Sequence, residues 1–229
     1  MVDTIKIKEM KSLIQLKGEL NTDKGGNYLS NYEKYFEHLR DKPINLLELG
    51  VNKGGSLLLW GRYFEKGTIS GVDINDVDIK QNSKLHFFKG SQSDRNFLNQ
   101  LAAQVAPGGF DIIIDDASHY GGLTKQSFQI LFERHLKPGG IYVIEDWGTG
   151  YWPDWVDGGE FNEPMDTEKE FPSHHFGMVG MVKQLIDELA RSDMKSDRLG
   201  NDPSKKPMIV EMAIYTGQVF LKKTTDIPK

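Results

Sequence analysis

The sequence of 229 residues contains no cysteine, which excludes disulfides, thiolate metal sites and a cysteine nucleophile. This absence is compatible with a reducing compartment. The sequence also lacks an uninterrupted apolar stretch long enough to span a membrane, and Lys6, Lys8 and Lys11 break up the apolar residues of the first segment. We therefore expect a soluble, cytoplasmic protein with neither a transmembrane helix nor a secretory leader.

Neither sign of charge is concentrated in a block. Lysine and arginine total 28 against 33 aspartate and glutamate, for a formal net charge of -5. A basic stripe or tail is the usual mark of proteins that bind nucleic acid or anionic membranes, so we expect neither partner. The length suits one α/β domain with a sizeable core and a small appendage.

Hydrophobic patterning predicts strands that alternate with helices. The runs 110–114 and 141–144 are rich in β-branched residues and do not alternate with polar ones, as in strands buried on both faces of a parallel sheet. Two closing strands around Tyr215-Thr216-Gly217 form a predicted hairpin. The expected strands are 45–49, 68–73, 85–89, 110–114, 141–144, 208–214 and 218–222. One helix is expected to begin at 54–56, and three more are expected at about 96–105, 123–136 and 178–191.

This order predicts an α/β fold with a doubly wound, mostly parallel sheet and an antiparallel C-terminal hairpin. We divide the chain into an N-terminal helical arm, 1–40, and a main domain, 41–229. Residues 147–177 lack periodicity, and a loop of that length in a compact domain is typically a lid or binding loop. The pair His174-His175 lies in it, and we expect a surface or lid role for both; the alternative is a second base or a ligand pair. Aromatic residues of this loop suit either stacking on a ligand or covering the core.

Acidic residues follow two of the predicted strands. Asp115, Asp116 and His119 follow the first, and Glu145 and Asp146 follow the second. The carboxyl ends of parallel strands form one rim, where α/β proteins bind ligands. Carboxylates that converge there repel one another unless they are protonated or bridged by a cation, and hard oxygen ligands suit Mg²⁺. The alternatives are that the aspartates cap turns, that Glu145-Asp146 is a solvated strand end and that His119 is structural.

A glycine-rich turn follows the first predicted strand, from Glu48 to Ser56. Asn52 stands where a dinucleotide-binding fingerprint has its second glycine, so we expect a nucleoside cofactor without a pyrophosphate. Asp73 ends the second strand, where it can accept hydrogen bonds from ribose hydroxyls. Ser91 and Gln92 follow the third strand, beside the expected adenine edge. The alternative is a tight turn in which Asp73 caps a helix.

At these motifs the chain resembles the class I S-adenosylmethionine-dependent methyltransferases, and most of all the bacterial sugar O-methyltransferases of the macrocin and mycinamicin type. The resemblance runs from about residue 21 onward and implies a Rossmann-like methyltransferase fold. Its motifs are LELG with GGS at 47–56, GSQSD at 90–94, DDASH at 115–119, LKPGG at 136–140, IED at 144–146 and NTDKGG at 21–26.

The resemblance also implies two cofactors and a set of site residues. Asp116, Glu145 and Asp146 would bind Mg²⁺ or another divalent cation. The catalytic residues would be His119, as general base, and Asp116. S-adenosyl-L-methionine would contact Glu48, Gly50, Ser56, Asp73, Ser91, Gln92 and Asp115.

The activity that this resemblance implies is methylation of a hydroxyl on a sugar or a glycosylated natural product. The partner would be a small glycoside or other polyhydroxylated molecule, with no nucleic acid and no membrane; homo-oligomer formation stays open. Two alternatives remain. The first is a catechol-type O-methyltransferase, whose chemistry needs less help from a base. The second is a non-catalytic partner in a biosynthetic complex, because the same glycine-rich turn can bind a cofactor without catalysing a reaction.

Overall fold

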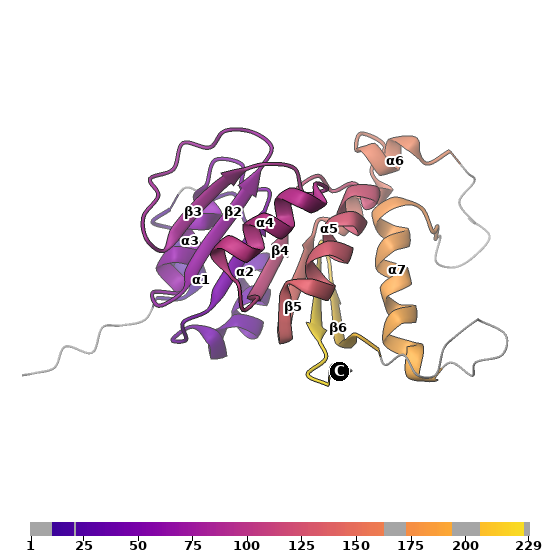
Figure 1. The fold of residues 1–229 in the computed structure, drawn as a ribbon. Coiled ribbons are helices and arrows are strands. Elements are labelled where there is room, and N and C mark those ends of the chain that lie inside the picture. Colours follow the sequence, from indigo (N-terminus) through magenta and orange to yellow (C-terminus); the bar gives the residue numbers. More distant parts are fainter. Residues whose placement is uncertain (1–10, 21, 163–172, 194–206, 227–229) are drawn as a thin grey trace, which may run out of the picture.

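The computed structural model describes residues 11–20, 22–162, 173–193 and 207–226. These residues form a seven-stranded sheet of order β3-β2-β1-β4-β5-β7-β6 (Figure 1). The first five strands pair in parallel, and β7 runs antiparallel to both β5 and β6. The predicted fold class is therefore confirmed. The strands are β1 Asn45–Leu49, β2 Thr68–Asp73, β3 Leu85–Lys89, β4 Phe110–Asp115, β5 Leu136–Glu145, β6 Ile209–Tyr215 and β7 Gln218–Lys223.

Helices cover both faces of this sheet and enclose two hydrophobic clusters. One cluster joins the sheet to α4 (Arg95–Val105), α5 (Gly121–Arg134) and α7 (Gly177–Leu189). The other joins it to α1 (Leu13–Lys17), α2 (Gly26–Phe36) and α3 (Gly55–Tyr63). Burial of the central strands on both faces explains why their sequences read as unbroken apolar runs.

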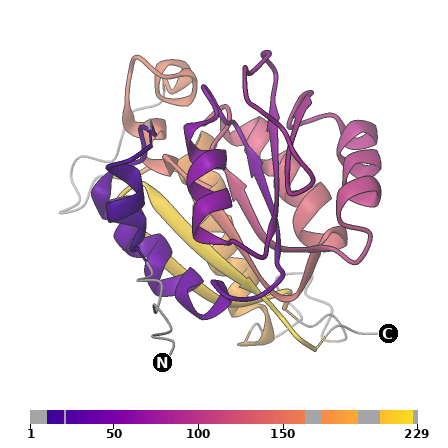
Figure 2. The ribbon, with the colours of Figure 1, turned by 90° about the vertical axis from the view of Figure 1, so that its left-hand side faces the viewer.

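The N-terminal arm packs as part of the second cluster. Leu13, Leu29, Tyr32 and Phe36 are each 0% exposed. Figure 2 shows the arm lying across the strand pair β6–β7 (yellow), and the Tyr35 ring stacks on that of Phe220 at 4.3 Å between centroids. This packing brings the residues that precede α2 to the carboxyl ends of the strands.

The boundary between α5 and β5 differs from the sequence prediction. The helix ends at Arg134 and the strand begins at Leu136, so Pro138 and its neighbouring glycines lie within β5. Leu136 pairs with Phe110, and the register then shifts before Ile112. Lys223 from β7 donates to the carbonyls of Phe132, Glu133 and Leu136 at 2.7 to 2.8 Å, which satisfies the end of α5 without further helical turns.

The 147–177 segment contains more regular structure than its sequence predicts. It begins with the 3₁₀ helix η2 (Trp147–Tyr151) and continues into α6 (Val156–Glu160), which Figure 1 shows beyond the end of α7. Residues 163–172 lie outside the described part. In the part that the structure does describe, no helix combines the length and apolarity needed to cross a bilayer.

Candidate metal and cofactor site

Strands β1, β4 and β5 lie side by side and end at one rim. Leu49 pairs with Asp115, and Asp115 in turn pairs with Ile144. A cavity of about 770 Å³ opens at this rim. Its lining contains Gly50, Asn52, Ser56, Asp73, Ser91, Gln92, Asp116, His119, Glu145 and Asp146, together with Lys24 and Tyr28 from the arm.

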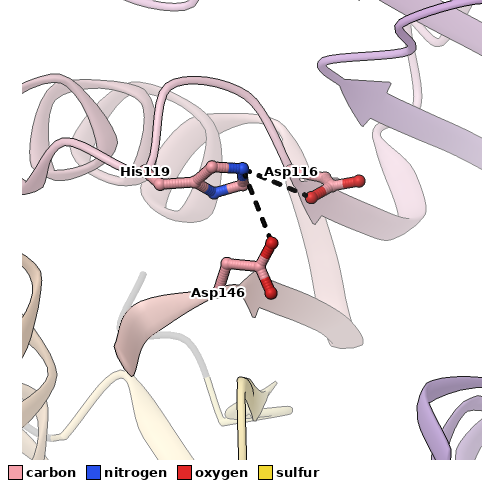
Figure 3. Close-up of side chains that lie close together, drawn as sticks. All are labelled: Asp116, His119 and Asp146. Carbon is pink, nitrogen blue, oxygen red and sulfur yellow. Dashed lines mark ion pairs between the residues drawn. The ribbon is translucent and has the colours of Figure 1, made fainter. Parts of the chain in front are cut away.

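Three of the predicted chemical groups meet in this cavity. Asp116, His119 and Asp146 each offer one ligand atom, and these atoms lie within 4.8 Å of one another. His119 Nε2 is 3.9 Å from Asp116 Oδ1 and 3.6 Å from Asp146 Oδ2, so the imidazole points between the two carboxylates (Figure 3). The two carboxylates suit a divalent cation, and the imidazole lies beside them.

The backbone holds these residues in an uncommon conformation. Among the described residues, the non-glycine positions with positive φ are Asn52 (46°), His119 (50°) and Asp146 (54°), and all three line the cavity. Left-handed backbone costs free energy for most residues, and its concentration at one site is typical of a functional site. At Asp146, a hydrogen bond of 2.5 Å from its N–H to the Gly217 carbonyl helps to hold the turn.

A buried lysine lies at the centre of the carboxylates. Lys24 is 4% exposed, and its Nζ is 2.7 Å from Glu145 Oε1, 3.0 Å from Asp116 Oδ2 and 3.1 Å from Glu48 Oε1. Burial opposes its charge, but the three carboxylates outweigh that cost and raise the pKa of Lys24 well above its ordinary value. The three carboxylates therefore favour the charged form of Lys24.

Two tyrosines of α2 also reach the end of β5. The Tyr32 hydroxyl donates to Glu145 Oε1, and the Tyr28 hydroxyl donates to Asp146 Oδ1. Glu145 is thus bound by two groups of the arm, and its carboxylate is not in the cluster of Asp116, His119 and Asp146. The structure brings Asp116 and Asp146 together as the sequence predicts, while the Glu145 carboxylate contacts Lys24 and Tyr32 instead.

The carboxyl groups here are harder to ionise than in water. Burial raises the pKa of Asp116 to about 6, against the attraction of Lys24. Burial and the neighbouring charge of Asp116 raise the pKa of Glu145 to about 7. Such shifts occur where acids are gathered out of water, and a bound cation would reverse them.

The glycine-rich turn also lines the cavity. Asp73 Oδ2 accepts hydrogen bonds of 3.0 and 3.1 Å from the N–H groups of Val51 and Asn52. Asp73 therefore shapes the turn, and it also lines the cavity where a ribose was expected. At Gly50, an added Cβ would lie 2.1 Å from the Asp116 carbonyl, so only glycine lets this turn approach the β4 end.

Two predicted cofactor contacts, Glu48 and Asp115, are buried below the cavity and do not line it. Glu48 Oε2 accepts from Ser56 Oγ at 2.6 Å and from Trp60 Nε1 at 3.2 Å. Both carboxylates therefore support residues of the cavity wall.

Asp115 acts through Gln92. Its Oδ1 accepts from Gln92 Nε2 at 3.1 Å, and the side-chain Oε1 of Gln92 accepts from the Ser118 N–H at 3.1 Å. Ser127 and Tyr142 also donate to Asp115. Burial raises its pKa to about 6, and these donors oppose that shift.

The two histidines of the 147–177 segment differ in their environment. His174 is buried between the rings of Phe161 and Tyr151, at 4.3 and 4.7 Å between centroids, and burial lowers its pKa. His175 is exposed. Trp155 packs against the His119 ring at 5.2 Å, so this segment contacts the predicted base.

Lys24, Tyr28 and Tyr32 are site residues that the sequence did not reveal as such. Their segment, NTDKGG followed by an aromatic helix, supports the resemblance but shows no chemical pattern of its own. Lys24 is 92 residues from Asp116 and 121 from Glu145, so only the tertiary fold joins them.

Comparisons with known proteins agree with this geometry. No protein-family model matches the chain. It is 33% identical over 204 residues to demethylmacrocin O-methyltransferase of Streptomyces fradiae, covering 86% of this chain and 48% of that protein. Mycinamicin VI 2''-O-methyltransferase of Micromonospora griseorubida is 32% identical over 208 residues, with the same coverage. A tetracenomycin rhamnosyl 2'-O-methyltransferase of Streptomyces olivaceus is 36% identical, over 76% of this chain and 45% of that protein.

Solved structures give the same result. The MycE methyltransferase of mycinamycin biosynthesis, in complex with Mg and SAH, superposes with a TM-score of 0.78 at 31% identity. The match covers 94% of this chain and 55% of MycE. The chain thus spans about half the length of the relatives that it matches. Over that length, the resemblance to the sugar O-methyltransferases and the class I methyltransferase fold are confirmed.

Proposed function

We propose that this chain, a relative of the bacterial sugar O-methyltransferases with the class I methyltransferase fold, transfers a methyl group from S-adenosylmethionine to a hydroxyl of a glycoside. The observation that supports this proposal is that Asp116, His119 and Asp146 line the same cavity as the glycine-rich turn. Such a cavity holds a nucleoside cofactor and a reacting hydroxyl side by side.

The donor set fits the divalent cation that accompanies MycE in its crystals. Asp116 and Asp146 would hold this cation through carboxylate oxygens, and Glu145 would join them only if Lys24 released it. When bound, the cation would polarise two neighbouring hydroxyls of a sugar and lower the pKa of the one to be methylated.

The cofactor end fits a nucleoside without phosphates. Gly50 and Asn52 bring backbone close to the cavity, and Asp73 offers carboxylate oxygens toward a ribose. Ser91 and Gln92 line the region after β3, where an adenine edge would lie. Bound there, S-adenosylmethionine would supply the methyl group.

His119 is placed to remove the proton of the substrate hydroxyl. Its Nε2 lies between two carboxylates in the cavity, where it could accept the proton of a bound hydroxyl. The left-handed backbone at residue 119 and the Trp155 ring hold the imidazole in this orientation. Fixing base and substrate in this geometry removes part of the entropic barrier.

A substrate screen with labelled methyl donor tests the proposal. Purified chain, S-adenosylmethionine and Mg²⁺ would be incubated with glycosides that present vicinal hydroxyls, their aglycones and simple catechols. We expect label only in glycosides, on a hydroxyl next to another hydroxyl. Label in catechols but not glycosides would favour the catechol alternative, and no transfer to any acceptor despite cofactor binding would favour the non-catalytic one.

A further inference from the structure

The loop between β4 and α5, residues 116–120, carries His119. Its backbone is left-handed at the histidine, with a φ of 50°, and contacts from other elements must hold this unfavourable conformation. On one side, the Ser118 N–H donates to Gln92 Oε1 at 3.1 Å. On the other side, the His119 carbonyl accepts from Thr149 Oγ1 at 3.4 Å. The contact with Gln92 is the shorter of the two, so we examined what holds Gln92.

Asp115 determines which way the Gln92 amide faces. An ionised carboxylate accepts hydrogen bonds and cannot donate them, so the NH₂ of Gln92 faces Asp115, with Nε2 at 3.1 Å from Oδ1. Ser127 and Tyr142 donate to the other oxygen, Oδ2. Asp115 and Gln92 are 2% and 6% exposed, so water competes little for these bonds. The Oε1 of Gln92 is therefore left facing the Ser118 N–H.

We propose that Gln92 is a positioning residue: held by Asp115, its amide fixes the backbone at Ser118 and thereby orients the imidazole of His119 toward the substrate hydroxyl. This inference rests on the proposed role of His119 as general base. Asp115 is the last residue of β4, so the two hydrogen bonds of Gln92 tie the loop to the rigid sheet. Orientation matters for the rate, because displacing a catalytic group by about 1 Å can cost about 10²-fold.

Two changes that keep the net charge test this role. Gln92→Met keeps the length of the side chain and removes both hydrogen bonds. The double variant Asp115→Asn/Gln92→Glu exchanges the carboxylate and the amide. The new amide at position 115 can donate to one oxygen at position 92, while the other oxygen still accepts from the Ser118 N–H. Gln100→Met, at an exposed position of α4, is the control.

The orientation of His119 is measured first, in ¹H–¹³C spectra of the imidazole rings recorded without cofactor or substrate. The chain contains six histidines, and the His119 signal is the one missing from His119→Gln. In the wild type, the Trp155 ring at 5.2 Å displaces this signal from that of a free imidazole. We expect Gln92→Met to move the signal toward the free position or to broaden it, and the double variant and the control to leave it in place. An unchanged signal in Gln92→Met would overturn the inference.

Single-turnover methyl transfer at saturating S-adenosylmethionine then separates orientation of the base from cofactor affinity. We expect Gln92→Met to lower this rate at least tenfold, and the double variant to stay within about threefold of the wild type. Gln92 also lines the cavity, and a role in cofactor binding alone would weaken S-adenosylhomocysteine binding yet leave the saturated rate unchanged. That result would overturn the inference, as would a double variant as slow as Gln92→Met.

If Gln92→Met does not fold, as judged by circular dichroism, Gln92→Asn takes its place. Its amide is one methylene shorter and cannot reach both Asp115 and Ser118, so the same changes are expected. A chain that methylates no acceptor would contradict the proposed function. The His119 signal would then decide by itself whether Gln92 holds the loop.

Discussion

The Asp157 carboxylate accepts a hydrogen bond of 2.6 Å from the backbone N–H of Met178, at the start of α7. The same oxygen accepts one of 2.9 Å from Gly121, the first residue of α5. Neither helix is capped by the side chain of its own N-cap residue. A buried residue of α6 therefore caps two core helices and ties the 147–177 segment to the domain.

Asp157→Ala should lower the free energy of unfolding by about 2–4 kcal/mol, because it leaves two buried N–H groups without an acceptor. Asp157→Asn keeps an acceptor oxygen and should cost less. Urea denaturation followed by circular dichroism measures both, with the exposed Asp154→Asn as control. An alanine variant as stable as the control would show that these caps contribute little.

Removal of the predicted base should affect turnover and spare cofactor binding. His119→Ala should lower turnover by roughly 10²- to 10⁴-fold, the range for loss of a general base. The affinity for S-adenosylhomocysteine should stay nearly unchanged, since the expected cofactor contacts lie on the glycine-rich turn and after β2 and β3, and His119 is not one of them. Single-turnover kinetics and calorimetry measure the two effects, with the exposed His175→Ala as control. Wild-type turnover in His119→Ala would remove the base assignment.

Activity should require a divalent cation. Chelation should abolish methyl transfer, and added Mg²⁺ should restore it. Asp146→Asn should raise the Mg²⁺ concentration for half-maximal activity at least tenfold, because it removes one carboxylate of the cluster in Figure 3. Asp76→Asn, whose side chain is 83% exposed, is the control. Full activity in excess chelator would mean that these carboxylates serve another purpose.

The effect of Mg²⁺ on stability should depend on pH. The pKa values of Asp116 and Glu145 rise from 3.8 and 4.5 to about 6 and 7 on folding. Groups with raised pKa values stabilise the metal-free fold below about pH 4, and this contribution is lost as the pH rises through 6 to 7. Asp116 is one of the carboxylates that would hold Mg²⁺, and Mg²⁺ binds its deprotonated form, so stabilisation by Mg²⁺ should appear as the pH rises through about 6.

Thermal unfolding at pH 5.5 and pH 8, with and without Mg²⁺, measures this linkage. We expect the rise in Tm on adding Mg²⁺ to be larger at pH 8. An equal rise at both pH values would contradict the link between Asp116 and the metal. Asp146→Asn should reduce the rise at pH 8.

The chain should bind S-adenosylmethionine and its demethylated product without competition from NAD. Asn52 leaves no glycine for a pyrophosphate to approach, while Asp73 faces the cavity. Calorimetry should show S-adenosylhomocysteine binding that Asp73→Asn weakens about tenfold, the loss expected for one hydrogen bond to a charged group. Asp78→Asn, at an exposed position, should have no effect. Tight NAD binding with no response to either sulfur compound would contradict the cofactor assignment.

The sequence alone predicted the strands, a mostly parallel sheet and the hairpin, because each depends on short runs of apolar residues and on local turn chemistry. It also predicted that Asp116, His119 and Asp146 share one rim, since parallel strands end on the same side. The predicted boundary between α5 and β5 was wrong: the helix ends at Arg134 and the strand begins at Leu136, instead of at 136 and 141. There, Lys223 satisfies the helix end from a strand about 90 residues away, which no local pattern shows.

Only the tertiary structure decided which carboxylates face the cavity and which are buried or paired with Lys24. Glu48, Asp115 and Glu145 are acidic residues near the carboxyl ends of parallel strands, just as Asp116 and Asp146 are. Yet the first two are buried below the cavity, and the third contacts Lys24. Which side of a strand end a carboxylate faces depends on the donors that other elements bring to it. Those donors come from the arm and from neighbouring helices, and burial strengthens their effect through the low dielectric of the interior.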